Sequence, residues 1–310
     1  MSQKLAENLA KIPVINWLVL LGKKIILPGF EGMSLYDLVE TYILGIVKGT
    51  FSARVGAISF SFFMALFPFL LFLLNLIPYV PIVIPSVTLQ DFQQEFLVFI
   101  SDALPSQTSI FISQVFNDIA GNPRGGLLSS VFVLSLFLMT NGINAVFSGF
   151  EHSYHNTINR NFFRQYIVAL GVSIIVALLL IVTVIVTIYF SYLVNKYAAG
   201  VIDDTVFWIT IGKYAFLVLM VFLTVSTLFY FDTTEGKESK YFSPEAFMTT
   251  LLSLLATYLF GIYIDNFSQY NQLYGSIGAL LIMMLYIWLN ANLLLLGFEL
   301  NASLNKFKKN

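Results

Sequence analysis

Six long apolar runs divide this chain of 310 residues and constrain its fold more than any other feature. An α-helix that crosses a bilayer needs about 20 predominantly apolar residues, and each run is close to that length or longer. With 58% hydrophobic and only 11% charged residues, the chain cannot cover itself with a water-compatible surface. The sequence therefore predicts an all-α, polytopic bundle of six transmembrane helices (55–300), with spans over 55–76, 127–150, 166–194, 206–231, 246–264 and 277–300.

The distribution of positive charge predicts the orientation of these spans. Lys and Arg near helix ends stay on the cytoplasmic side of a membrane. Most of the 16 Lys and Arg residues lie before the first run, after the second and fourth runs, or in the basic tail over 301–310. We therefore expect both termini in the cytoplasm. The third run is almost unbroken Val, Ile, Leu and Ala, and it is expected to be a lipid-facing scaffold.

Two regions outside the spans have amphipathic patterns that predict further helices. In the N-terminal region, 1–54, we expect an interfacial helix over 12–22 and a second helix from Ser34 to Gly49. Between the first two spans, Thr88 and Asp91 are placed to cap a helix, and a Leu-Pro break at 104–105 separates it from another. The sequence thus predicts a small two-helix extracytoplasmic cap over 80–126.

Polar residues inside the second span form a stripe. They recur at offsets of three and four, so they share one helical face that continues into the following connection. One interpretation is a seam of hydrogen bonds between helices, and the other is the lining of a polar path. The members of this stripe are Asn141, Asn144, Ser148, Glu151 and His155.

A second set of polar residues is expected near the cytoplasmic end of the last span. Asn292 and Glu299 are seven positions apart and share a face, and a carboxylate in that helix needs a partner. Arg54, at the start of the first span, lies at the matching depth. The pair is either a structural anchor of two helix ends or part of a gate or headgroup site.

Several classes of function have no support in the sequence. The chain has no Cys, only two His and no P-loop, so we expect no metal, no cofactor and no ATPase. The net charge of −1 gives no basic field for nucleic acid. We therefore expect a protein that is not an enzyme.

Several segments resemble the YihY/BrkB family of bacterial inner-membrane proteins. The most specific are LYGSIGALL (273–281) and LLLGFELNA (294–302). GAISFSFFMALFP (56–68) is similar to the family's first-span motif, with Phe60 where Tyr is usual. The Leu-Pro break and RNFFR (160–164) agree as well, so the resemblance covers about residues 30–305.

The resemblance implies a role in the bacterial inner membrane. Members have been labelled ribonuclease BN, although two neighbouring His cannot supply the ligands of a zinc nuclease. Others are linked to export of lipid-anchored envelope precursors. Our hypothesis is a flippase-like protein that moves a lipid or other amphiphile, with Arg160 and Arg164 contacting a headgroup phosphate. The alternative is a non-transporting scaffold for an envelope assembly. Membrane lipids are the expected partners, and a homo-oligomer is left open.

Overall fold

The computed structural model is almost entirely helical in the part of the chain that it describes. Six helices in that part are long and apolar enough to cross a membrane, as the sequence predicts. They are α4 (Phe51–Leu76), α8 (Leu128–Glu151), α9 (Phe162–Leu193), α10 (Thr205–Asp232), α11 (Pro244–Asn266) and α13 (Ser276–Lys309). The described residues are 13–25, 34, 36, 51–83, 88–120, 128–151, 161–198, 204–232, 241–266 and 276–309.

The helix ends extend beyond the predicted spans in ways that matter for the polar residues. Helix α4 begins at Phe51, so Arg54 lies inside its first turn rather than before it. Helix α9 begins at Phe162 after an Asn161 N-cap, which places Arg164 in its first turn. Helix α13 continues through the predicted tail as far as Lys309.

The smaller elements lie before α4 and between the spans. Helix α2 (Pro13–Lys24) covers the predicted interfacial segment, and the helix expected from Ser34 to Gly49 lies outside the described residues except for Ser34 and Tyr36. A 3₁₀ turn (Ile77–Tyr79) and the short α5 (Val80–Val83) follow α4, and a π-helical turn (Val194–Ala198) ends α9.

Helices α6 (Leu89–Ala103) and α7 (Ser106–Ala120) form the hairpin predicted between the first two spans. Thr88 and Asp91 make the capping box that starts α6, with the Asp91 backbone N–H donating to the Thr88 hydroxyl over 3.1 Å. Leu104 is extended before Pro105, as steric contact with a proline ring requires. The placement of this hairpin outside the cytoplasm stays a prediction.

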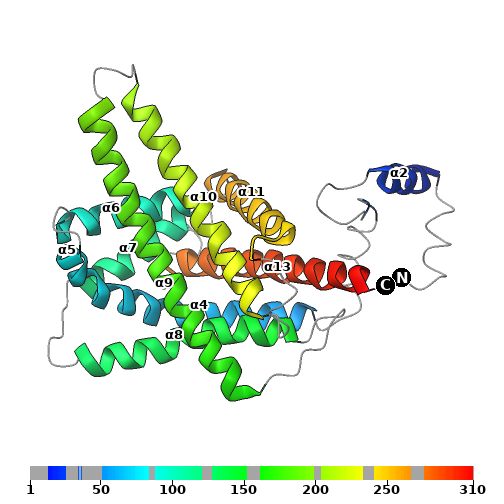
Figure 1. Cartoon of the computed structure of the whole chain (residues 1–310), viewed down its shortest axis with the longest axis horizontal. Coiled ribbons are helices and arrows are strands. Elements are labelled where there is room, and N and C mark those ends of the chain that lie inside the picture. Colours follow the sequence, from blue (N-terminus) through cyan, green and yellow to red (C-terminus); the bar gives the residue numbers. More distant parts are fainter. Residues whose placement is uncertain are drawn as a thin grey trace.

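The hairpin is part of the bundle rather than a lid resting on it. Figure 1 shows α6 and α7 beside the end of α4, with α9 crossing them, and α7 also packs against α13. The aromatic residues Phe92, Phe96 and Phe116 are each only 1% exposed. They join residues from the second half of α4, such as Phe72 and Leu73, in one apolar core.

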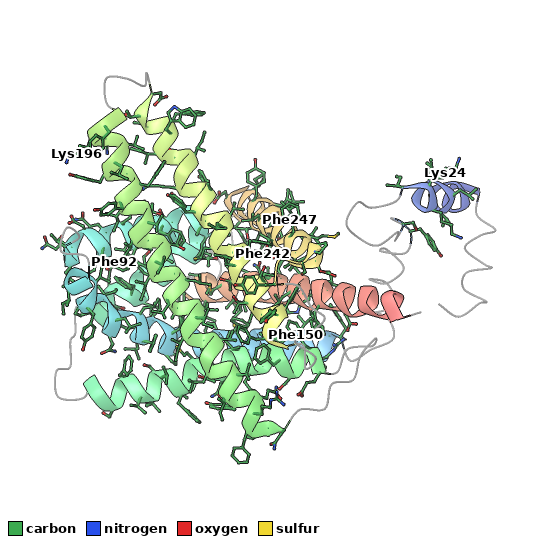
Figure 2. All side chains as sticks on the ribbon, viewed as in Figure 1. Lys24, Phe92, Phe150, Lys196, Phe242 and Phe247 are labelled. Carbon is green, nitrogen blue, oxygen red and sulfur yellow. The ribbon has the colours of Figure 1, made fainter. Side chains whose placement is uncertain are left out.

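A second apolar core fills the opposite end of the bundle. It combines the first half of α4 with the last turns of α8 and the middle of α13, and it includes residues of α9, α10 and α11. Phe150 lies at its centre, stacked on Phe298 with ring centroids 4.1 Å apart. Figure 2 labels one residue of each core, Phe92 on the hairpin and Phe150 on α8. Both ends of the bundle are therefore closed by packed side chains.

The expectation that the third span is a lipid-facing scaffold is wrong. In the most apolar stretch of α9, 39% of the residues are buried, against 11% in α10. Ala169 and Ala177 of α9 are fully buried, and the helix packs against α8, α10 and α6. Small residues allow helix backbones to approach closely in a membrane, where apolar character alone does not distinguish a lipid face from a protein face.

Candidate functional site

An ion pair beside the second apolar core joins three helices. The Arg54 guanidinium of α4 donates from Nη2 to Oε1 of Glu299 on α13 over 2.8 Å, and from Nη1 to the Gly149 carbonyl oxygen of α8 over 2.9 Å. The two side chains are 7% and 0% exposed. The pairing of Arg54 with Glu299 is thus confirmed. Their place in a polar path or seam stays a prediction.

The surroundings of this pair explain its geometry. Gly149 leaves room for α4, because a Cβ there would lie 2.6 Å from Cδ1 of Ile58. The ring of Phe51 lies 5.8 Å from the Arg54 guanidinium carbon, and the stacked rings of Phe150 and Phe298 belong to the same core. In such apolar surroundings removal of one charged partner is costly, because the other charge is left buried and unpaired.

The stripe on α8 faces away from the α4 contact. Asn141 and Ser148 are exposed, and Asn144 and Glu151 are half-buried. The side of α8 that meets α4 carries Gly142 instead, where a Cβ would lie 2.9 Å from Cβ of Ala65. The fifth predicted member, His155, lies outside the described residues.

One buried residue of α9 contacts the end of this stripe that carries Ser148 and Glu151. The Gln165 side chain is 4% exposed and lies 3.1 Å from the Ser148 hydroxyl. In the amide orientation that satisfies both of its ends, Gln165 accepts from Ser148 and donates to Oε1 of Glu151 over 2.8 Å. Sequence reasoning missed Gln165. Its signal was an uncharged polar residue immediately after Arg164 at the start of an apolar run.

The remaining predicted residues are not brought together. Asn292 is half-buried and donates to the Trp288 carbonyl oxygen of its own helix over 2.7 Å. Arg164 is exposed next to Gln165, and Arg160 lies outside the described residues. The side-chain amide of Asn292 therefore bonds within its own helix. Arg164 lies in the first turn of α9, next to the Gln165 that contacts Ser148 and Glu151.

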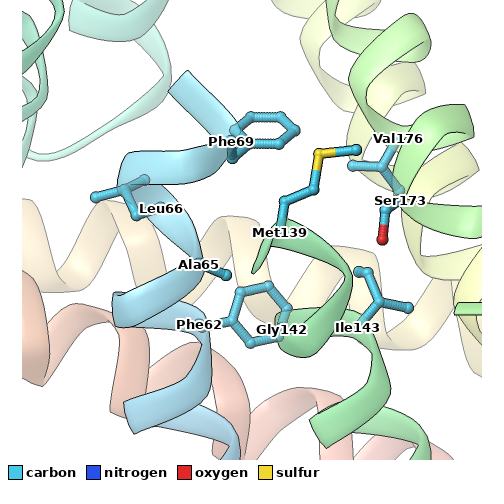
Figure 3. A pocket seen from close by; sticks show the side chains of 9 residues that line it. All are labelled: Phe62, Ala65, Leu66, Phe69, Met139, Gly142, Ile143, Ser173 and Val176. Carbon is cyan, nitrogen blue, oxygen red and sulfur yellow. The ribbon is translucent and has the colours of Figure 1, made fainter. Parts of the chain in front are cut away.

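A cavity of about 220 Å³ lies between α4, α8 and α9 (Figure 3). None of the stripe residues lines it. Apart from Ser173, its walls are apolar or glycine; they are formed by Phe62, Ala65, Leu66, Phe69, Met139, Gly142, Ile143, Ser173 and Val176.

Polar contacts tie the hairpin to two spans. Lys213 of α10 pairs with Glu95 of α6, and the Ser106 hydroxyl of α7 donates to Oδ1 of Asp265 on α11 over 2.6 Å. Burial raises the pKa of the nearby Asp102 carboxyl; Lys213 opposes this shift and Glu95 adds to it. The sequence analysis gave Lys213 no partner. Its partner was hidden because the two residues are distant in the chain.

Within the described ranges, no three His, Cys, Asp or Glu side chains gather as they would around a metal ion. The described residues instead form a buried ion pair between α4 and α13, a partly exposed polar stripe on α8 and an apolar cavity.

A family model described as "Virulence factor BrkB" matches residues 45–310. The chain belongs to the BrkB family. It is 25% identical over 260 residues to a putative ribonuclease-like protein, YfkH, of Bacillus subtilis (strain 168), covering 83% of this chain and 91% of that protein. The chain is also similar to proteins whose names describe them only as membrane proteins.

Two such relatives are UPF0761 membrane proteins. One, from Psychrobacter sp. (strain PRwf-1), is 22% identical over 284 residues, which cover 90% of this chain and 50% of that protein. Another, from Xanthomonas axonopodis pv. citri (strain 306), is 35% identical over 65 residues, which cover 21% of this chain and 15% of that protein. This chain thus spans half or less of the length of these two relatives. No solved structure matches it. The protein is a multi-pass membrane protein of the BrkB family.

Proposed function

We propose that this protein moves a lipid or another amphiphile across a bacterial inner membrane, without an ATPase of its own. The observation that carries the proposal is the exposure of Asn141 and Ser148 on a spanning helix. Polar side chains that face hydrocarbon are costly, so their natural neighbour is a polar group that enters the membrane with them. The headgroup of an amphiphile supplies such a group while its tails stay in the bilayer.

The cytoplasmic end of the stripe has the chemistry to receive a headgroup. Arg164 is exposed there, beside the network that Gln165 makes with Ser148 and Glu151. A cation at this level attracts anionic phosphate. In this proposal Arg54 and Glu299 hold the helix ends together and do not contact the headgroup, because both are buried.

Reconstitution in liposomes tests the proposal. Vesicles of phosphatidylethanolamine and phosphatidylglycerol would carry a fluorescent phospholipid that an impermeant reductant quenches only in the outer leaflet. We expect the protein to speed quenching of the inner pool, and Asn141→Leu combined with Ser148→Leu to slow it about thirtyfold, since each of the two polar groups lost raises the barrier by on the order of 1 kcal/mol. The double variant should stay folded, because Leu suits a lipid-facing position and Gln165 keeps its contact with Glu151.

A matched control uses exposed apolar residues of the same helix. Val133 and Leu134 are 65% and 56% exposed, and Val133→Leu with Leu134→Ile should leave the rate unchanged. If folded wild-type protein and empty vesicles give the same rate, lipid movement is wrong. If the stripe variant moves lipid as fast as the control, the path lies elsewhere.

The second candidate is a non-transporting scaffold for an envelope assembly. The same exposed stripe favours it, because polar side chains of another protein or of a second copy can also contact the exposed Asn141 and Ser148. The apolar face of the hairpin offers less to a partner, since Phe92, Phe96 and Phe116 are already buried within the bundle. Crosslinking in membranes followed by purification separates the two: a stoichiometric partner that is lost with Asn141→Leu and Ser148→Leu supports the scaffold.

A further inference from the structure

The cavity between α4, α8 and α9 lies near the middle of the candidate spans that line it. Its α4 walls, 62–69, are central in the span Phe51–Tyr79, and its α8 walls, 139–143, are central in Phe132–Glu151. The two apolar cores lie toward the ends of these helices, so the cavity occupies a gap in the packing between them. The interior of a protein is normally close-packed, and a void of this size leaves its walls without contacts on one side.

The walls make this cavity unsuitable for water. Ser173 carries the only polar side chain among them, and its hydroxyl donates to the Ala169 carbonyl oxygen of its own helix over 2.7 Å. A buried water needs two to four polar partners, and apolar cavities of about 150 Å³ stay dry while accepting small hydrocarbons. Hydrocarbon is therefore the chemistry that fits.

The shape of the cavity restricts the occupant further. Gly142 and Ala65 line it where α8 and α4 approach each other (Figure 3). Phe62, Leu66 and Val176 are half-buried, so the cavity is not sealed by protein at these positions. At about 220 Å³ it is smaller than the roughly 300–1,000 Å³ of a pocket for a complete small-molecule ligand. Part of one acyl chain fits it, whereas a whole lipid does not.

We propose that an acyl chain of a membrane phospholipid occupies this cavity and fills the gap between α4, α8 and α9. Hydrocarbon is the solvent at this depth, so transfer from the bilayer gains no hydrophobic free energy. The chain is retained by the dispersion contacts that the empty walls would lack. The inference goes beyond the proposed movement of an amphiphile, since the stripe and the cavity lie on different faces of α8.

Photocrosslinking tests the occupant directly. The full chain would be reconstituted in phosphatidylethanolamine and phosphatidylglycerol vesicles with a phosphatidylcholine probe that carries a diazirine in the middle of one acyl chain. After illumination, mass spectrometry locates the labelled residues. We expect 62–69, 139–143 and 173–176 to be labelled more strongly than freely exposed apolar positions such as Val182, which is 52% exposed.

Two variants fill the cavity and a third is the matched control. Val176→Phe and Ser173→Leu should each reduce labelling of 139–143 by roughly fivefold or more, because the added side chain takes the space of the acyl chain. Val182→Phe makes the same change as Val176→Phe on an exposed part of α9 and should leave that labelling unchanged. Size-exclusion chromatography selects folded protein of each variant.

Two results would overturn the inference. In the first, the wild-type protein is labelled in proportion to the exposure of each residue, and the cavity residues are not enriched. If neither cavity-filling variant folds, the wild-type labelling alone decides whether an acyl chain occupies the cavity. In the second, Val176→Phe or Ser173→Leu folds, and its residues 139–143 are labelled as strongly as those of Val182→Phe. Neither result depends on lipid movement, so failure here leaves the proposed transport to its own assay.

Discussion

The burial of one Arg and one Glu shows how single residues determine where α4, α8 and α13 meet. Glu299 is fully buried, and Arg54 satisfies it while also binding the Gly149 carbonyl oxygen. The Nε of Arg54 has no hydrogen-bond partner among the described residues, so the charge is not fully solvated by protein. A buried pair of this kind adds little net stability over apolar residues, but it specifies which helix ends meet.

Breaking this pair should destabilise the protein far more than removing an exposed charge. We expect Arg54→Leu to lower the free energy of unfolding by about 3–5 kcal/mol, because Glu299 is left buried without its partner. Arg54→Leu combined with Glu299→Leu should recover much of that loss. Reversible unfolding in mixed micelles with increasing dodecyl sulfate, followed by tryptophan fluorescence, measures both.

The control for this prediction is Arg164→Leu, since Arg164 is exposed in the first turn of α9. Its effect on stability should be within about 0.5 kcal/mol. Equal stability of the Arg54→Leu and Arg164→Leu variants would show that the buried pair does not anchor the helices.

At the scale of helices, close approaches depend on a few glycines. Gly297 of α13 faces Thr249 of α11, and a Cβ at Gly297 would overlap the Thr249 hydroxyl, which donates to the Glu245 carbonyl oxygen. Gly261 of α11 has no atom within 4 Å of the Cβ position. The same glycine-to-alanine change should therefore have opposite consequences at the two positions.

We expect Gly297→Ala to separate α11 from α13 and to cost about 1–3 kcal/mol, as overpacked sites do. Gly261→Ala should be neutral or stabilising by up to about 1 kcal/mol, because Ala is the better helix former. The unfolding assay described for Arg54 compares them. A Gly297→Ala variant as stable as Gly261→Ala would mean that the two helices are not in contact at this point.

The sequence predicted those features of the helices that depend only on residues near one another in the chain. The apolar runs predicted all six spans, and the Thr88 and Asp91 pattern predicted the start of α6, because spans and caps depend on neighbouring residues. The neighbours of α9 were not predictable. Most of its side chains are apolar whether they are buried or exposed, so hydrophobicity does not tell which helices meet the buried side at Ala169 and Ala177.

The candidate site was predictable only in part. Arg54 and Glu299 could be matched because a charge at a given depth needs an opposite charge. The contact of Gln165 with Ser148 and Glu151 could not, since an amide has many acceptable partners. The cavity left no mark in the sequence. It is a space between three helices, and its walls have the ordinary composition of a span.

At the scale of the whole molecule, the two ends of the bundle differ in chemistry. The end that holds Arg54 also carries Arg164 and the basic end of α13, whereas the other end holds the hairpin and Lys213 paired with Glu95. The positive-inside rule predicts that the first end faces the cytoplasm. Because the chain contains no Cys, single-cysteine variants report on this arrangement without further changes.

We expect Gln90→Cys, at an exposed position of α6, to react with a membrane-impermeant maleimide in intact bacterial cells that express the protein. Asn310→Cys should react only after the membrane is permeabilised, since we place the C-terminus in the cytoplasm. Ala177→Cys, at a fully buried position of α9, should stay unlabelled until the protein is denatured. Labelling of Asn310→Cys in intact cells, with Gln90→Cys protected, would invert the orientation. The exposed Arg164 would then face the outside, away from the anionic lipids of the cytoplasmic leaflet, whose negative surface potential attracts a cation.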